Sequence, residues 1–289
     1  MKLEETPLVS ILMTSYNREQ YIEDAIVSVI NSTYQNWELI IVDDLSTDRS
    51  YDIAGSYALK DSRISAYQNE SNLGDYPNRN MAASKAKGEY LIYVDSDDMI
   101  YPYSVERCVF YMNKYPSAGI GISRPYSPDG MYPIVYSPKN AIKKHYLDNP
   151  YLNHAPGSVI IRRHKFIEIG GFTIFRHISD NILWVKMANQ FDVVLLPRVL
   201  SWPRSHEFQE LKYEIKKLEP IVELFKFNIS FISRCNHFTE KERLQAVRSI
   251  NSNYTRKILS DIKHFRFNRA VKLIKHWIKN DFDKKNENQ

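Results

Sequence analysis

The sequence contains few glycines and few cysteines, and their positions argue against several classes of protein. Only nine of its 289 residues are glycine and two are cysteine. Gly119 and Gly121 begin a Gly-x-Gly, but Arg124 stands where a dinucleotide-binding fingerprint needs its third glycine. No glycine precedes Lys-Ser or Lys-Thr, as a P-loop requires. Cys108 and Cys235 are too far apart to form a zinc-type cluster by themselves. Common NAD enzymes, P-loop NTPases and zinc-cluster proteins are therefore disfavoured.

Long apolar runs are also missing. The run Leu39–Val42 is typical in length, whereas a membrane-spanning helix needs roughly 20 apolar residues. Residues Met1–Glu5 are acidic, whereas a secretory signal is first basic and then apolar. Because cysteine is scarce as well, we expect a cytoplasmic protein.

The net charge of +5 is concentrated in one segment. Residues 254–289 contain ten Lys or Arg against four Asp or Glu, so the rest of the chain is nearly neutral. A nucleic-acid-binding protein more often carries basic residues throughout its body. We therefore expect no nucleic acid partner, and the basic segment requires its own explanation.

Short apolar strands alternate with amphipathic helices in the first hundred residues. We expect strands at 8–14, 38–42, 63–68 and 90–94 and helices at 22–30, 50–59 and 76–86, with Gly88 ending the last helix. This alternation predicts an α/β fold with a parallel sheet. Ligands of such sheets bind at the carboxyl ends of the strands.

The second half is more mixed. We expect strands at 157–162 and 192–196, with a helix at 180–189 between them, and a helical region after Phe208. Thr239 followed by Glu242 is a capping-box signature for a helix that begins near Glu240.

One group of aspartates follows the predicted strand 90–94. On an extended backbone Asp95 and Asp97 point the same way, and Asp98 follows them. Clustered carboxylates repel one another, and a divalent cation such as Mg²⁺ or Mn²⁺ relieves that repulsion. A solvated acidic turn or a helix cap is the alternative that the short motif alone favours.

A second group closes the strand 38–42. Asp43 and Asp44 are placed to accept hydrogen bonds from a ribose or a base edge, whereas Ser46 or Asp48 caps the next helix. Arg79, in the first turns of the helix 76–86, is either a charge partner for a carboxylate or diphosphate or an ordinary surface arginine.

Four spaced motifs carry a family resemblance. They are VSILMTSYN at Val9–Asn17, DDLSTD at Asp43–Asp48, the N-L-G…R-N segment at 72–80, and VDSDD at Val94–Asp98. Their order and intervals resemble family-2 glycosyltransferases of the GT-A fold over roughly residues 7–206. The resemblance implies a Rossmann-like, mostly parallel sheet flanked by helices, with a helical C-terminal extension. Residues 1–116 would form the nucleotide-sugar-binding half, 117–206 the acceptor-binding half of the same domain, and 207–289 the extension.

The resemblance also implies roles for single residues in the donor site. Thr14 and Tyr16 match positions that hold the nucleobase, Tyr16 by stacking, and Asp44 with Asp43 nearby matches the carboxylate that reads uracil. Arg79 matches the arginine beside the base and the acidic pair. Asp95 matches the ribose-contacting aspartate, Asp97 the metal ligand, and Asp98 a further or alternate ligand. The nucleotide-sugar-binding set is thus Thr14, Tyr16, Asp43, Asp44, Arg79, Asp95 and Ser96, and the cofactor is Mn²⁺ or Mg²⁺.

Two further positions match the family's second half. The segment Gly170–Phe172 followed by Ser179 and Asp180 resembles its Gly-Gly-Phe…Glu-Asp, in which the aspartate is the general base. Ser179 departs from the usual glutamate, and Asp180 is otherwise a helix N-terminal residue favoured by the helix dipole. His206, in an Arg-x-His segment, either approaches the diphosphate or metal or is a surface histidine.

The basic segment fits an amphipathic helix over Phe267–Lys279. Phe267, Val271, Ile274 and Ile278 share one face, with Trp277 at its boundary and the basic residues on another face. Such a helix either binds an anionic membrane surface or packs on the body of the protein.

The sequence therefore predicts a metal-dependent inverting glycosyltransferase of hexosyl- or N-acetylhexosaminyl type. Its donor is expected to be a UDP-sugar and its acceptor a saccharide or lipid-linked saccharide of bacterial surface polysaccharide assembly, at the inner face of the membrane. One alternative is a catalytically inactive nucleotide-sugar-binding scaffold, to which only Ser179 points. Another is a sugar-phosphate nucleotidyltransferase, which needs a glycine-rich basic loop where Thr14–Arg18 stands.

Overall fold

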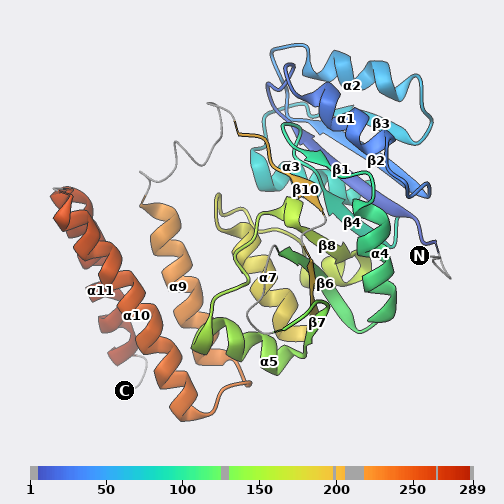
Figure 1. Cartoon of the computed structure of the whole chain (residues 1–289). Helices are drawn as coiled ribbons and strands as arrows, with labels where there is room; N and C mark the ends of the chain where they lie inside the picture. The colour runs from blue at the N-terminus through green and yellow to red at the C-terminus, as the bar shows by residue number, and fades with distance from the viewer. Residues whose placement is uncertain (1–5, 125–129, 198–199, 206–217, 265, 287–289) are drawn as a thin grey trace. The chain divides into compact units, whose positions relative to one another are not determined.

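The computed structural model describes residues 6–124, 130–197, 200–205, 218–264 and 266–286 (Figure 1). The chain forms two compact units, one of residues 1–141 and 151–206 and the other of residues 142–150 and 207–289. Up to residue 205 the elements are β1 (Val9–Ser15), α1 (Ile22–Ile30), β2 (Trp37–Asp43), α2 (Ser50–Ala58), β3 (Ile64–Gln68), α3 (Asp75–Ser84), β4 (Tyr90–Tyr93), β5 (Met99–Ile100), α4 (Ser104–Lys114), β6 (Ala118–Arg124), β7 (Ile134–Tyr136), α5 (Pro138–Lys143), η1 (Lys144–Asp148), η2 (Pro156–Ser158), β8 (Val159–Arg162), α6 (Arg163–Ile169), α7 (Ser179–Gln190), β9 (Asp192–Pro197) and β10 (Ser201–Trp202). The helices α9 (Glu219–Arg234), α10 (Glu240–Lys263) and α11 (Phe267–Asn286) follow.

The first unit is built on one eight-stranded sheet in the order β3-β2-β1-β4-β8-β6-β9-β7. Strands β3, β2, β1 and β4 run parallel, as do β6 and β9. Strand β8 is antiparallel to both β4 and β6, and β7 is antiparallel to β9. The predicted mostly parallel α/β sheet is therefore confirmed, and the carboxyl ends of β1, β2 and β4 meet at one edge.

Helix α1 shows why the sequence pattern predicts the packing so well. Ile22, Ala25, Ile26 and Val29 are each completely buried, in one core cluster with alternate residues of β1 and with side chains of α2 and α4. Burying one such aliphatic side chain is worth about 1.5–3 kcal/mol. Helix α3 packs on β1 and β2 without joining this cluster, and so covers the other face of the sheet.

Gly119 and Gly121, which match only the first part of a dinucleotide-binding motif, lie in the interior strand β6. A Cβ on Gly119 would lie 2.8 Å from the Cβ of Phe191, and one on Gly121 would lie 2.8 Å from Ile160 Cγ2. Because these glycines have no side chain, neighbouring side chains can pack directly against the backbone of the strand. Because glycine weakens strand propensity, the sequence pattern did not predict β6.

The sequence pattern predicted that Gly88 ends helix α3, and this prediction is wrong. The helix ends at Ser84, and a Cβ on Gly88 would lie 2.5 Å from the Ser10 backbone nitrogen. Its N–H donates to Ser10 Oγ at 2.8 Å. The residue is a glycine because the chain passes tightly against β1.

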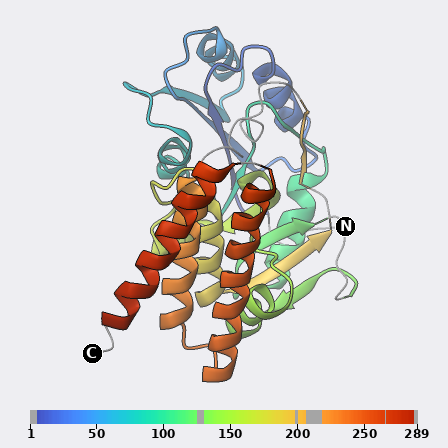
Figure 2. The same ribbon diagram turned by 90° about the vertical axis from the view of Figure 1, so that its left-hand side faces the viewer.

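In the described part of the second unit, helices α9, α10 and α11 lie side by side, drawn from orange to red in Figures 1 and 2. Thr239 and Glu242 form the predicted capping box at the start of α10. Ala270 and Leu273 of α11 are buried in the cluster between the helices, whereas Phe267 is 54% and Val271 49% exposed. The face of α11 that packs is therefore rotated from the predicted apolar face, because the flank that carries Ala270 makes the packing contact. Among the described residues, no helix is long and apolar enough to cross a membrane.

Candidate active site

The loop after β1 presents an exposed aromatic ring at the carboxyl edge of the sheet. Tyr16 is 47% exposed, and Thr14 is partly buried at the end of the strand. The loop is rigidly held, because the Asn17 N–H donates to Ser46 Oγ at 2.9 Å and the Thr47 N–H donates to Asn17 Oδ1 at 2.9 Å. An exposed tyrosine on a braced loop can stack on an aromatic base.

Asp43 and Asp44 are both buried and both hold loops. Asp43 accepts the Ser46 N–H at 2.8 Å and the Gln68 side-chain amide at 3.1 Å. Asp44 accepts the backbone N–H groups of Leu73 and Gly74, each at 2.8 Å. The Asp44 carboxylate thus connects β2 to the start of α3. Asp48, the residue before the N-cap of α2, accepts the Ser50 N–H at 2.9 Å, which supports the capping alternative for that aspartate.

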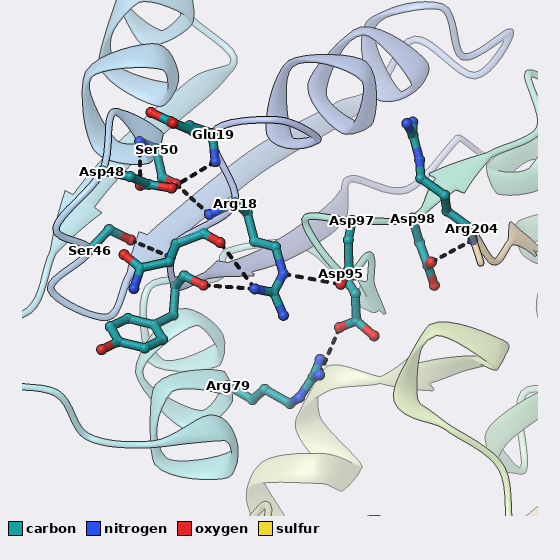
Figure 3. Close-up of polar contacts among 12 residues, drawn as sticks. Arg18, Glu19, Ser46, Asp48, Ser50, Arg79, Asp95, Asp97, Asp98 and Arg204 are labelled. Carbon is teal, nitrogen blue, oxygen red and sulfur yellow. Dashed lines mark hydrogen bonds and ion pairs between the residues drawn. The ribbon is translucent and has the colours of Figure 1, made fainter. Parts of the chain in front are cut away.

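Arg79 is buried and makes two ion pairs, so it is a charge partner and not a surface arginine. Its Nε lies 2.7 Å from Asp75 Oδ1, and its Nη2 lies 2.7 Å from Asp95 Oδ1 (Figure 3). Burial acts to lower the pKa of Arg79, but the carboxylates of Asp75 and Asp95 raise it above its usual value. The guanidinium therefore stays charged beside the acidic residues.

The segment Asp95–Asp98, here called the acidic turn, is not extended. The Asp98 N–H donates to the Asp95 carbonyl at 2.9 Å, which closes a turn around the buried Ser96. The expectation that Asp95 and Asp97 alternate on an extended strand is therefore wrong, because β4 ends at Tyr93. The turn still gathers the three carboxylates.

Each carboxylate of the acidic turn has a basic residue beside it. Asp95 pairs with Arg79, Asp97 pairs with Arg18 at 3.1 Å, and Asp98 accepts the Arg204 N–H at 3.0 Å (Figure 3). Burial and the neighbouring charges of Asp95 and Asp97 nevertheless raise the pKa of Asp98 to about 7. Ionisation of Asp98 is therefore less favourable than that of an exposed aspartate.

The side chains of the acidic turn are suitable ligands for a hard divalent cation. Carboxylate oxygens suit Mg²⁺ or Mn²⁺, particularly where phosphates complete the coordination. The described residues include no preformed group of three or more metal-ligating side chains. His206, the third sequence candidate, lies outside the described residues. Asp97 and Asp98 are the candidates that remain.

Asp180 is the second residue of α7 and is partly buried in the first unit. It accepts the Asn181 N–H at 2.7 Å and the Asn181 side-chain amide at 2.9 Å. Burial raises the pKa of Asp180, whereas these bonds, a hydrogen bond from Tyr76 and the charge of Arg79 act against that rise. Ser179, in place of the usual glutamate, is fully buried and donates to the Thr173 carbonyl at 2.9 Å.

The two glycines before Phe172 are required by the backbone. Gly170 and Gly171 have φ of +87° and +67°, a region that other residues rarely adopt. The Phe172 N–H then donates to Asn80 Oδ1 at 3.0 Å, and Asn80 Nδ2 donates to the Phe172 carbonyl at 2.8 Å. This reciprocal pair attaches the segment before α7 to α3.

Sequence reasoning missed three residues of the site: Arg18, Tyr76 and Asn80. Each acts over a long sequence distance, 79 residues for Arg18 with Asp97 and 92 for Asn80 with Phe172. Tyr76 and Asn80 stand inside the quoted segment 72–80, and Arg18 directly follows the motif Val9–Asn17. These positions are the one signal that could have drawn attention to the three residues. All three lie within a turn or two of residues that the motifs did identify.

Solved structures share this fold. S. aureus TarS 1-349 in complex with UDP-GlcNAc matches with a TM-score of 0.65 at 18% identity, over 83% of this chain and 70% of that one. A Pyrobaculum calidifontis mannosyltransferase in complex with GDP-Man and Mn²⁺ matches with a TM-score of 0.62 at 14% identity, over 97% and 89%. The fold is thus of the GT-A glycosyltransferase type.

The sequence comparison identifies the family. Residues 10–183 match Glycosyl transferase family 2, and the chain belongs to that family of enzymes. A putative teichuronic acid biosynthesis glycosyltransferase of Bacillus subtilis is 42% identical over 37% of this chain and 42% of its own length. A putative colanic acid biosynthesis glycosyl transferase of Escherichia coli is 38% identical over 43% and 49%. The chain therefore spans less than half the length of these relatives.

Proposed function

We propose that the protein is an inverting glycosyltransferase that moves a sugar from a UDP-sugar to a saccharide or lipid-linked saccharide, with Asp180 as general base. The observation that carries this proposal is the position of Asp180. Its partly buried carboxylate interacts with Tyr76, which lies on the same helix that presents Arg79 to the acidic turn. The proposed proton acceptor and the proposed donor site thus lie in the same unit.

The donor would bind along the edge formed by β1, β2 and β4. Tyr16 stacks on the base beside Thr14, while Asp43 and Asp44 shape the loops around it and Asp44 reads the uracil edge. Asp95 accepts from the ribose, held in place by Arg79. Asp97 and Asp98, with His206, would hold the cation. A bound Mn²⁺ or Mg²⁺ would supply positive charge that holds the diphosphate and stabilises it as a leaving group.

In the transfer step, the acceptor oxygen bonds to the anomeric carbon as the bond from that carbon to the diphosphate oxygen breaks. The electron pair leaves with the diphosphate, and the hydroxyl proton moves to Asp180. A carboxylate whose pKa is raised by burial holds this proton better than an exposed one, which favours general-base catalysis near neutral pH.

The C-terminal helix supports a peripheral membrane location at the inner face of the cell membrane. Phe267 and Val271 are half exposed, and Trp277 is 37% exposed, in the segment that carries the excess positive charge. An anionic lipid surface attracts such a basic segment and accepts its apolar side chains. The named relatives in teichuronic and colanic acid synthesis favour a role in surface polysaccharide assembly.

Thermal unfolding with UDP, GDP, CMP and ADP, each with Mn²⁺ and then with EDTA, tests the donor class. A ligand at 100 times its Kd stabilises the protein by about 2.7 kcal/mol. We expect UDP with Mn²⁺ to raise the Tm and EDTA to abolish the increase. Stabilisation by GDP instead of UDP would reassign the donor, and UDP binding without any transfer to acceptors would identify an inactive scaffold.

A further inference from the structure

Arg18, on the loop between β1 and α1, bridges the predicted base site and the acidic turn. Its Nε donates to Asp97 Oδ2 at 3.1 Å. Its Nη1 donates to the backbone carbonyls of Tyr16 and Asn17, each at 3.1 Å. Figure 3 shows the guanidinium pointing from its loop toward Asp97. The positively charged guanidinium of Arg18 therefore lies among three oxygen atoms, one of a carboxylate and two of backbone carbonyls.

The pairing has a clear electrostatic reason. Asp95, Asp97 and Asp98 lie within one turn, so their carboxylates repel one another when ionised. Arg79 is already shared between Asp75 and Asp95. Arg18 adds a positive charge at Asp97 and reduces the repulsion when no other cation is bound.

The same pairing must compete with a metal ion. Asp97 Oδ2 cannot direct the same lone pairs to Arg18 and to a cation. The ion pair is partly exposed, with side-chain exposures of 25% for Arg18 and 18% for Asp97, so the long arginine side chain can leave without a large desolvation penalty. Once released, the Arg18 guanidinium would lie between Tyr16, the proposed base-stacking residue, and the acidic turn. The diphosphate of the proposed donor would lie in the same region.

We propose that Arg18 is a resident counter-charge that a divalent cation displaces from Asp97, and that Arg18 then moves onto the diphosphate of the donor. This inference rests on the proposed donor site. Arginine suits both positions, because its planar guanidinium binds carboxylate and phosphate oxygens with similar geometry. Release of Arg18 from the Tyr16 and Asn17 carbonyls also couples the metal site to the base-binding loop.

The test measures Mn²⁺ and UDP affinity separately in Arg18→Gln, which removes the charge at little change in size. Mn²⁺ binding without nucleotide should tighten by about three- to fivefold, because the competing cation is gone. UDP binding at saturating Mn²⁺ should weaken by about tenfold, because a charge-assisted phosphate contact is lost. Opposite changes in the two affinities are the signature of this mechanism.

Two further variants control the experiment. Arg63→Gln breaks a similarly exposed pair with Asp61, whose closest atoms are 2.8 Å apart, and should change neither affinity. Arg18→Lys keeps the charge and guards against a folding defect in Arg18→Gln, and it should show the same two changes at smaller size. In an Asp97→Asn background, Arg18→Gln should no longer tighten Mn²⁺ binding.

The outcomes separate this inference from the proposed function. Wild-type protein that binds Mn²⁺ and UDP, with an Arg18→Gln variant whose Mn²⁺ affinity is unchanged or weaker, overturns the role of Arg18 alone. Wild-type protein that binds neither ligand overturns the donor site and this inference together.

Discussion

The hydroxyl of Tyr76 on α3 donates a hydrogen bond to the carboxylate of Asp180 on α7. The Tyr76 ring is buried and packs 5.1 Å from the ring of Phe172, which in turn lies 6.0 Å from Trp184 on α7. Three aromatic side chains thus hold the proposed base against the helix that carries Arg79. Asp75 and Arg79 are the charged groups of α3 nearest to this hydrogen bond.

This hydrogen bond predicts a pH effect. Burial raises the pKa of Asp180, and the bond from Tyr76 acts against that rise by stabilising the ionised carboxylate. A general base is active when it is ionised, so activity falls as the pH drops through its pKa. In Tyr76→Phe the pKa rises further, and the acidic limb of kcat/KM should move to higher pH while the rate above that limb changes little.

Tyr57→Phe is the matched control for this experiment, because it removes a hydroxyl that donates to Glu23 at 2.8 Å on α1. Its pH profile should equal that of the wild type. A uniform loss of activity in Tyr76→Phe, with the acidic limb unmoved, would assign Tyr76 a purely structural role.

Asp180 and Asp97 should separate chemistry from donor binding. Asp180→Asn should reduce kcat by about 10²–10⁴-fold, the usual contribution of a general base, and leave UDP affinity intact. Asp97→Ala should reduce both transfer and Mn²⁺-dependent UDP binding. Single-turnover assays and calorimetry measure the two effects, and equal loss of UDP binding in both variants would contradict the assigned roles.

Gly171→Ala should destabilise the first unit. The residue has φ of +67°, and an added Cβ would lie 2.8 Å from Asn80 Oδ1, so the substitution both strains the backbone and disturbs the bond to Phe172. We expect a loss of about 1–3 kcal/mol in the free energy of unfolding by urea. Gly55→Ala, inside α2 with open space around it, should instead gain about 0.5–1 kcal/mol.

The exposed apolar side chains of α11 should matter for lipid binding. The double variant Phe267→Ser, Val271→Ser should float less with vesicles that contain anionic lipid, and high salt should weaken the binding of the wild type. Leu244→Ser, at a similarly exposed position on α10, is the control and should float like the wild type. No flotation of the wild type at any salt concentration would remove the membrane proposal.

The sequence by itself determined the elements whose signals are local. The spacing of Ile22, Ala25, Ile26 and Val29 predicted α1 and its buried face, and Thr239 with Glu242 predicted the start of α10. Both signals act within a few residues, where backbone geometry alone decides which side chains meet. The aspartates at the ends of β2 and β4 could be found from the strand ends in the same way, whereas Asp180 was identified only through the resemblance of its segment to the family's Gly-Gly-Phe…Glu-Asp.

Only the tertiary structure decided what these residues contact. The strand β6 could not be predicted, because its two glycines serve neighbours on β8 and near the end of α7. The pairs of Arg18 with Asp97 and of Asn80 with Phe172 join segments 79 and 92 residues apart, and no local pattern records such a distance. The face of α11 that packs was likewise set by the neighbouring helices and not by its own periodicity. Contacts of this kind depend on the path of the whole chain, because the free energy of folding depends on the complete tertiary arrangement and not on any single segment.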